Sequence, residues 1–402
     1  MTVWNFVKEN SLLLIIGALI ALYWGNTNPE NYHHFVETMI WDHALIGHAH
    51  LDGNGHVHRS LTLHFLINDV LMALFFAIAG KEVWEAVALK NGSLRGKKAA
   101  TPLIATAGGM FGPITVYLGL AAILGKEVYE ATANGWAIPT ATDIAFSYLV
   151  GRLVFGPKHP AIAFLLLLAI ADDAAGLVIL AIFYPQGTIE ISWMLLPIVA
   201  MAFNYFVLQR FFKVVNFWPY LIIGGSISWI GFHYAGIHPA LGLLPIIPTM
   251  AHADSDLGIF ARQEKTRDDT LNAFEHRMAG FVQVILFFFA LANAGVAFSA
   301  IGEATWLVLA GLLLGKPFGI LFFGWLAARP LGLGIPEGMK ISDLFVIGCV
   351  AAIGFTVSLF VASVAFPPSE VQDAAKMGAL FSFIAAVLSL IAGKFLRVER
   401  KV

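Results

Sequence analysis

Residues 161–183 read AIAFLLLLAIADDAAGLVILAIF, a run of apolar or small side chains that is long enough to cross a bilayer as one helix. Two acids, Asp172 and Asp173, interrupt this run near its midpoint. A carboxylate at the centre of a bilayer costs about 2.5 kcal/mol or more, and two adjacent carboxylates cost more because each opposes ionisation of the other. Because intramembrane acids usually mark ion or proton pathways, the pair predicts cation or proton handling rather than a purely structural salt bridge.

The composition of the chain indicates a polytopic membrane protein. Of its 402 residues, 58% are hydrophobic and only 12% are charged, and the mean hydropathy is +0.78. The formal net charge of −2 is close to neutral and argues against a nucleic-acid partner. The single cysteine, Cys349, lies in an apolar run, so an internal disulfide is not possible.

Apolar windows predict an all-α fold with about twelve transmembrane helices in one transporter domain, residues 1–402. The windows are 11–25, 64–89, 99–124, 136–150, 160–184, 192–209, 217–232, 237–251, 274–299, 304–328, 342–366 and 373–395. With a cytoplasmic N-terminus, the outside loops hold only Arg59, Lys126 and Lys376 as basic residues. This asymmetry fits the positive-inside rule and predicts that both termini are cytoplasmic.

The first outside loop, residues 26–63, is predicted to contain a small periplasmic β-hairpin. The turn sequence DGNG at 52–55 separates HAHL from the alternating run HVHRSLTL. Alternate residues of a strand share a face, so the two His-x-His pairs, at 48–50 and 56–58, could bind zinc. An exposed contact surface is the interpretation we favour.

Few other charges fall inside the predicted spans. Lys316 lies between apolar residues in LLLGKPFGI, and a lysine in hydrocarbon must lose its proton or find a carboxylate. We therefore predict an ion pair between Lys316 and one of the central aspartates. Asp69 lies one turn into the second span. Three charges at the inner end of that span are expected to be reached by water: Lys81, Glu82 and Glu85.

Two spans are predicted to be interrupted. In GWAIPTATDIAFS, residues 135–147, Pro139 breaks the helix and nearby threonine hydroxyls can satisfy the freed backbone groups. A second weak helix occurs at GCVAAIGFTVS, residues 348–358. The two spans run in opposite directions, and paired interruptions of this kind indicate a transporter site built from inverted repeats. Asp143 is placed to neutralise two helix N-termini there.

Six stretches between about residue 60 and the C-terminus are informative in combination: LINDVLMALFFAIAGKEV, GWAIPTATDIAFS, LLLLAIADDAAGLVILAIFY, FFFALANAGVAFS, LLLGKPFGI and GFTVSLFVAS. Together they resemble the NhaA family of sodium/proton antiporters. The resemblance implies an inverted-repeat core, residues 99–184 and 304–395, with two crossing broken helices. The chain departs from the family in its histidine-rich hairpin and in Trp84-Glu85, where basic residues often follow Glu82.

The resemblance also implies roles for individual residues. Asp172 and Asp173 match the pair that binds cations and protons, with Asp173 the more direct Na⁺ ligand, and Lys316 matches the lysine that pairs with Asp172. Thr142 and Asp143 match residues at the crossing of the broken helices. The remaining matches concern the ion pathway and the pH response: Asp69, Glu82, His238 and Glu275.

The expected function is exchange of cytoplasmic Na⁺ or Li⁺ for external H⁺ by a pH-regulated, electrogenic transporter of the bacterial inner membrane. The resemblance further implies a homodimer formed through the hairpin, contact with membrane lipid, and no cofactor beyond the transported ions. A sodium-coupled organic-solute symporter of related fold is the alternative, although it requires a roomier polar cavity. An intramembrane aspartyl protease is not favoured, because adjacent residues of one helix point about 100° apart and cannot flank one water. A passive channel would show ion flux without proton coupling.

Overall fold

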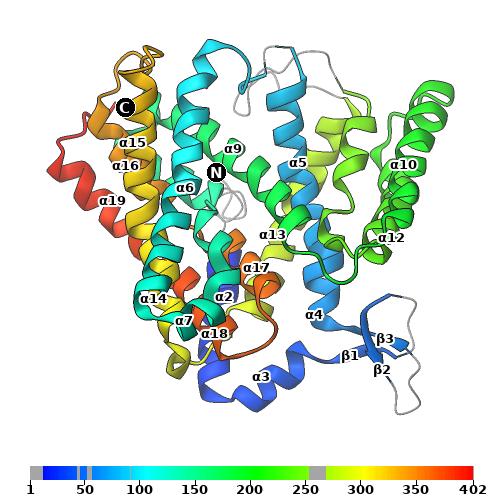
Figure 1. Ribbon diagram of the computed structural model, residues 1–402. Coiled ribbons are helices and arrows are strands. Elements are labelled where there is room, and N and C mark those ends of the chain that lie inside the picture. Colours follow the sequence, from blue (N-terminus) through cyan, green and yellow to red (C-terminus); the bar gives the residue numbers. More distant parts are fainter. Residues whose placement is uncertain (1–11, 43–45, 52–56, 91, 253–268, 402) are drawn as a thin grey trace. The chain divides into compact units, whose positions relative to one another are not determined.

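The computed structural model describes residues 12–42, 46–51, 57–90, 92–252 and 269–401. The chain is mainly helical and divides into two compact units (Figure 1). The described residues of the first unit are 92–179 and 298–401. Those of the second unit are 12–42, 46–51, 57–90, 180–252 and 269–297. The first unit thus contains most of the two segments that we expect to form inverted repeats, and the repeat relationship itself stays a prediction.

The first unit contains helices that meet at two interruptions. Its elements are α6 (Lys97–Leu124), α7 (Lys126–Thr132), η2 (Ala133–Thr140), α8 (Ile144–Phe155), α9 (Pro160–Phe183, in this unit as far as Ile179), η9 (Phe298–Ala300), α14 (Glu303–Ala310), η10 (Gly311–Gly315), α15 (Lys316–Ala328), α16 (Ile341–Ala351), α17 (Phe355–Ala365), α18 (Glu370–Phe381) and α19 (Ile384–Phe395).

The second unit contains the remaining helices and a small sheet. Its elements are α2 (Leu12–Thr27), α3 (Pro29–Val36), β1 (Met39–Trp41), β2 (His48–Leu51), β3 (Val57–Thr62), α4 (Leu63–Phe65), η1 (Leu66–Leu71), α5 (Met72–Ala88), η3 (Ile191–Met194), α10 (Leu195–Ala202), η4 (Phe203–Phe211), α11 (Phe217–Pro219), η5 (Tyr220–Gly225), α12 (Ser226–Tyr234), η6 (Pro239–Leu241), η7 (Leu244–Thr249) and α13 (Thr270–Asn293).

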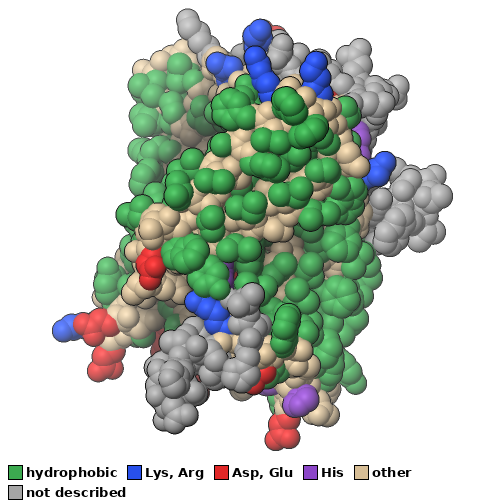
Figure 2. Space-filling model, turned by 90° about the vertical axis from the view of Figure 1, so that its right-hand side faces the viewer, with side chains coloured by type: hydrophobic (Ala, Val, Ile, Leu, Met, Phe, Trp, Pro, Cys, Tyr) green, Lys and Arg blue, Asp and Glu red, His purple; other side chains and the backbone are tan. Residues whose placement is uncertain are grey.

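Each predicted membrane window contains helical backbone. Among the described residues, seven helices are long and apolar enough to cross a membrane, and α16 with α17 makes an eighth span if the bent pair is counted as one. The other windows coincide with shorter elements: α2, η2 with α8, α11 to α12, and η6 with η7. Hydrophobic side chains cover much of the surface in Figure 2, as a lipid-facing surface requires.

The two predicted interruptions are present. The 3₁₀-helix η2 ends at Thr140, three residues without helical structure follow, and α8 begins at Ile144. In the other span, α16 and α17 meet at an angle of 55° across residues 352–354. Pro139 lies in the last turn of η2, where its missing N–H removes one helical hydrogen bond.

Glycines bring α6 against η10 and α15 in the first unit. A Cβ atom at Gly112 would lie 2.2 Å from the carbonyl oxygen of Gly315, and one at Gly319 would lie 2.1 Å from that of Gly108. Small residues allow such close approach in membranes, where helix association depends on packing. Because Lys316 directly follows Gly315, this contact fixes the position of Lys316 in the unit.

The predicted hairpin is confirmed, and the loop that contains it holds more structure than we expected. Strand β3 pairs with β2 in antiparallel register, with His50 opposite His58, and β1 adds a third strand on the other edge of β3. The helix α3 precedes the sheet and was not predicted. The zinc prediction concerns the side chains of the two His-x-His pairs, and these lie outside what the structure describes.

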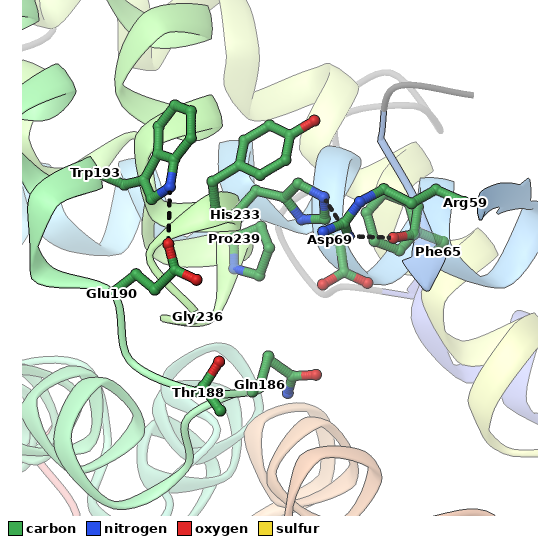
Figure 3. A pocket seen from close by; sticks show the side chains of 13 residues that line it. Arg59, Phe65, Asp69, Gln186, Thr188, Glu190, Trp193, His233, Gly236 and Pro239 are labelled. Atoms are coloured by element: carbon green, nitrogen blue, oxygen red, sulfur yellow. Dashed lines mark hydrogen bonds between the residues drawn. The ribbon is translucent and has the colours of Figure 1, made fainter. Parts of the chain in front are cut away.

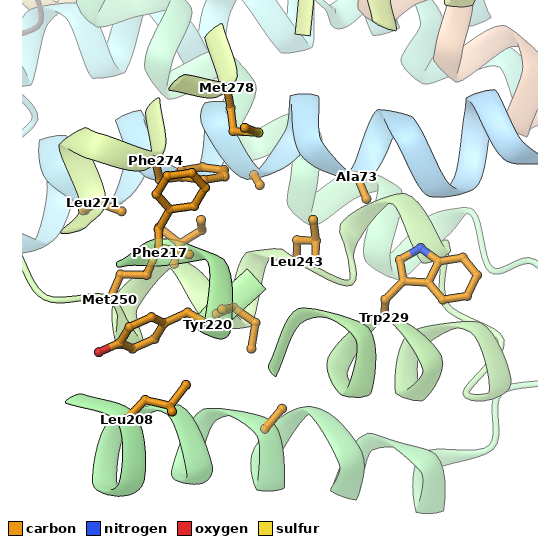
Figure 4. Packing of buried hydrophobic residues seen from close by; sticks show 14 of the residues in the cluster. Ala73, Leu208, Phe217, Tyr220, Trp229, Leu243, Met250, Leu271, Phe274 and Met278 are labelled. Atoms are coloured by element: carbon orange, nitrogen blue, oxygen red, sulfur yellow. The ribbon is translucent and has the colours of Figure 1, made fainter. Parts of the chain in front are cut away.

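A cluster of buried apolar side chains forms the core of the second unit around η1 and α5. Figure 4 shows Phe274 and Met278 beside α5, Tyr220 next to Leu208, and Trp229 of α12 below Ala73 of α5. The cluster joins α5 to α10, η4, α12 and α13. It therefore holds η1 and α5, which carry Asp69 and the acids near the end of the second span.

The glycine contact in the first unit predicts the effect of adding one methyl group. We expect Gly112→Ala to lower stability by about 1–3 kcal/mol, because its Cβ would meet backbone atoms that cannot move aside. Gly119→Ala on the same helix is the control: no atom lies within 4 Å of its Cβ, so we expect no loss of stability. Thermal unfolding in detergent measures both, and equal melting temperatures would contradict the close contact.

Candidate ion-binding site

A buried ion pair forms in the middle of α9. The Lys316 Nζ atom lies 2.8 Å from Asp172 Oδ2, and the two side chains are 0% and 2% exposed. The predicted ion pair of Lys316 therefore forms with Asp172, as the family resemblance implied. Each removal of a charge from water costs several kcal/mol, so neither residue would be tolerated there without the other.

Residues from the first interruption complete the surroundings of this pair. The hydroxyl of Thr142 donates to Asp172 Oδ2 at 2.6 Å and also lies 3.0 Å from the carbonyl oxygen of Ala351. Lys316 Nζ donates a second hydrogen bond to the carbonyl oxygen of Thr140. That carbonyl is free to accept because η2 ends at this residue. The break in the helix thus supplies oxygen ligands beside the charged pair.

Asp143 lies at the N-terminal ends of two helices. Its Oδ1 atom caps α8 by accepting a hydrogen bond from the N–H of Phe146 at 3.2 Å. Its Oδ2 atom accepts from the hydroxyl of Thr356 and, at 3.4 Å, from the N–H of the same residue in the first turn of α17. One carboxylate therefore faces the partial positive charge of both helix ends, as we expected from the sequence.

The two interruptions are also joined through backbone groups that the breaks leave without helical partners. The N–H of Asp143 donates to the carbonyl oxygen of Ile353 at 2.7 Å. The Ser147 hydroxyl donates to Val350 at 3.0 Å, and the Ser358 hydroxyl donates to Ile138 at 2.8 Å. Our sequence analysis did not identify Thr356, Ser147 or Ser358. A serine or threonine within one helical turn of a Gly or Pro interruption is the sequence signal that could have identified them.

Asp173 differs from Asp172 in its surroundings. It is half-buried, whereas Asp172 is buried. It lies near enough to Lys316 for an electrostatic interaction, but the direct ion pair is made by Asp172. Adjacent residues of a helix point about 100° apart, so the two carboxylates cannot share one position. The arrangement offers one carboxylate held by a lysine and a second that is more accessible.

In the second unit, Lys81 is buried and lies between two acids. Its Nζ atom is 2.6 Å from Glu85 and 2.6 Å from Glu275. The expectation that water reaches Lys81 and Glu85 is wrong, because their side chains are only 3% and 8% exposed. The acids offset the desolvation of the lysine, which makes its burial possible. Glu82 is half-buried and interacts electrostatically with Glu275 and Lys81.

The other two residues predicted for the pathway and pH response lie together in the same unit. His238 Nδ1 is 3.8 Å from Asp69 Oδ1, and both residues are buried. The four residues thus form two groups, Asp69 with His238, and Glu82 with Glu275. Their proposed roles in transport are not tested by this proximity.

Comparison with known proteins assigns the chain to a family. The sequence profile described as Na⁺/H⁺ antiporter 1 matches residues 3–394. The chain belongs to this family. It is 63% identical over 417 residues to the Na⁺/H⁺ antiporter NhaA of Jannaschia sp. (strain CCS1), with 99% of each chain covered. It is 46% identical over 400 residues to the NhaA of Desulfitobacterium hafniense (strain DSM 10664 / DCB-2), with 98% of this chain and 96% of that protein covered.

Membership of the Na⁺/H⁺ antiporter 1 family confirms the resemblance found in the sequence and places the protein among multi-span membrane transporters rather than enzymes. Among solved structures, the sodium/proton antiporter MjNhaP1 of Methanocaldococcus jannaschii is 13% identical, with 98% of each chain covered and a TM-score of 0.44. That TM-score is too low to add to the assignment. The comparisons give no support to the organic-solute symporter.

The buried pair predicts an asymmetric response to substitution. We expect Lys316→Met to destabilise the protein by about 3–5 kcal/mol, because Asp172 keeps its place without a compensating charge. The double variant Lys316→Met/Asp172→Asn should recover most of that loss, since both charges are then absent. Thermal unfolding in detergent is the measurement.

The matched control for this experiment is the exposed ion pair of Lys340 and Glu399, with side chains 57% and 71% exposed. We expect Lys340→Met to leave the melting temperature unchanged, because water screens such pairs. A double variant at Lys316 and Asp172 that is no more stable than Lys316→Met alone would show that the pair is not the source of the effect.

Proposed function

We propose that the protein exchanges Na⁺ or Li⁺ for H⁺ across the bacterial inner membrane, and that Asp172, Asp173 and Lys316 carry out the exchange. The observation that supports this most strongly is the buried Lys316–Asp172 ion pair beside the half-buried Asp173. Family membership supports Na⁺ and H⁺ as the ions, and the geometry supports the proposal that a metal cation and protons compete for the same carboxylates.

Cation binding begins at the accessible carboxylate. Na⁺ binds deprotonated Asp173, with Asp172, the Thr142 hydroxyl and backbone carbonyls of the first interruption as further oxygen ligands. Hard cations prefer such ligands. When a cation takes Asp172, it replaces the lysine as the partner of that carboxylate. Lys316 then releases its proton, because a buried ammonium without a counter-charge is strongly disfavoured.

Alternating access follows from movement of one repeat, residues 99–184, against the rest of the transporter. The site opens to the cytoplasm for Na⁺ and to the outside for protons, which displace the cation. Exchange of two protons for one Na⁺ would move one net charge per cycle, and the membrane potential would then contribute roughly 2.3 kcal/mol per 100 mV. The distribution of basic residues supports cytoplasmic N- and C-termini.

The pathway and the pH response are assigned to Asp69, Glu82, His238 and Glu275. Glu82 and Glu275 accompany the buried Lys81, so a change in their protonation would alter the charge balance of that group. Low pH would also leave the carboxylates of the transport site protonated and idle. No cofactor is proposed, since Na⁺, Li⁺ and H⁺ are themselves the substrates.

We also propose a homodimer in lipid, formed through the sheet. Strand β1 is an edge strand of the order β1-β3-β2, so one side of its backbone lacks a strand partner in the described chain. Its side chains Met39, Ile40 and Trp41 are 56%, 50% and 65% exposed. An exposed, apolar edge strand is suited to pairing with a second copy of the chain.

The exchange is tested in everted membrane vesicles with a respiration-generated pH gradient, followed by acridine-orange fluorescence. We expect NaCl or LiCl to dequench the dye with the wild type, and Asp173→Asn to remove at least about nine-tenths of the response because the direct cation ligand is lost. Glu127→Gln, which removes an exposed acid of the first unit, should respond like the wild type.

Two results would count against the exchange. A full response in Asp173→Asn would remove this carboxylate from the site. Absence of any Na⁺ or Li⁺ response at every pH tested, with the wild-type protein present in the membrane, would contradict antiport itself. Sodium flux without any change in the gradient would indicate a channel.

A further inference from the structure

A polar cavity of about 330 Å³ lies within the second unit (Figure 3). The sheet, η1, the connection before η3 and the end of α12 all contribute to its walls. Its charged and polar lining includes Arg59, Asp69, Gln186, Glu190 and His233. The lining residues all belong to the second unit, whereas Asp172, Asp173 and Lys316 belong to the first.

The Asp69 carboxylate lines this cavity and has no hydrogen-bond donor among the described residues. Asp69 is only 7% exposed. The nearest polar group, His238 Nδ1, is 3.8 Å away and accepts a hydrogen bond from the N–H of Ala240, so it has no proton to offer. A carboxylate in such a place without a protein donor must be satisfied by a cation, a proton or water in the cavity.

The backbone of Asp69 is held by a hydrogen bond, whereas its carboxylate receives no hydrogen bond from the described residues and has only the 3.8 Å contact with His238. The indole N–H of Trp229 donates to the carbonyl oxygen of Asp69 at 2.8 Å. That residue lies in the π-helical turn η1, which interrupts the regular helix hydrogen-bond pattern. Figure 3 shows the carboxylate directed into the open space between the labelled side chains. The turn therefore fixes where this acid points.

A second acid, Glu190, approaches the cavity from the other wall. The indole N–H of Trp193 donates to Glu190 Oε2 at 3.2 Å and orients the carboxylate. The wall itself is ordered by backbone hydrogen bonds from Gln186 to Gly236 at 2.8 Å and from Glu190 to Ala235 at 3.1 Å. Two oriented carboxylates thus face one cavity from different elements (Figure 3).

The one cation in the described lining, Arg59, makes its contacts with neutral groups. Its Nη1 atom lies 3.2 Å from the carbonyl oxygen of Gly47 and 3.2 Å from His233 Nε2, and its guanidinium lies 5.1 Å from the ring centre of Tyr234. A guanidinium can only donate, so His233 Nε2 must accept and the imidazole is neutral in this arrangement. When both acids are ionised, two carboxylates and one guanidinium give the described lining one net negative charge.

We propose that this cavity binds a hydrated monovalent cation of the Na⁺ class between Asp69 and Glu190. The single net charge is balanced by a monovalent ion, whereas a divalent ion would leave an excess positive charge. A cavity of about 330 Å³ is far larger than a bare ion, so the cation keeps much of its water. The proposal goes beyond the exchange mechanism, because it predicts Na⁺ binding that persists when Asp172 and Asp173 are neutralised.

The test measures ²²Na⁺ binding to purified full-length protein by scintillation proximity, with choline chloride holding the ionic strength constant. In the Asp172→Asn/Asp173→Asn background we expect Na⁺ binding to remain. Adding Asp69→Asn should weaken it at least about tenfold, and adding Glu190→Gln should weaken it about threefold, because Glu190 contributes from the more exposed wall. Glu37→Gln, an exposed acid of the same unit, is the control and should change nothing.

A second measurement covers the case in which the background variant does not fold. In the wild type, saturating ²²Na⁺ should label about two sites per chain, and Asp69→Asn should leave one. Loss of all binding in the folded background variant, or unchanged binding after Asp69→Asn, would overturn the proposal. Displacement of Na⁺ by Mg²⁺ but not by Li⁺ would overturn the proposal that the cavity takes a monovalent cation. Failure of exchange in vesicles would leave these binding results unaffected.

Discussion

The ion pair between Lys316 and Asp172 is the interaction on which the first unit depends. Two charges are taken out of water near the centre of an apolar helix, and their separation of 2.8 Å allows each to offset the desolvation of the other. The close glycine contact of α6 with η10 and α15 fixes the backbone next to Lys316 and so positions its side chain for the ion pair. A transport site built on such a pair can exchange one positive charge for another.

The interrupted helices also depend on satisfying polar groups away from water. A membrane offers no water to backbone groups, so each carbonyl or N–H freed by a break must find a partner within the protein. The freed groups at the two breaks bond to one another, to serine and threonine hydroxyls, and to the charged residues themselves. Asp143 joins the two helix N-termini, and Thr140 contributes its carbonyl to Lys316. The breaks therefore place polar groups where a cation site requires them.

Much of this arrangement could be predicted from the sequence because the signals are local. The acids within an apolar run, Lys316 in another such run, the Pro and Gly interruptions and the turn of the hairpin can each be recognised within a few residues. The partners of these groups could not be predicted in the same way. Thr356 contacts Asp143 across 213 positions of sequence, and Lys81 contacts Glu275 across 194, so folding alone brings them together. The burial of Lys81 was missed for that reason.

The central claim is that a metal cation and protons compete for Asp172, Asp173 and Lys316 of the first unit. The most direct measurement is the release of protons when NaCl is added to purified protein in a weakly buffered detergent solution, followed with a pH indicator. The account predicts release with Na⁺ or Li⁺ but not with choline, and its loss in Asp173→Asn. Binding of Na⁺ to the wild type without any proton release would contradict it.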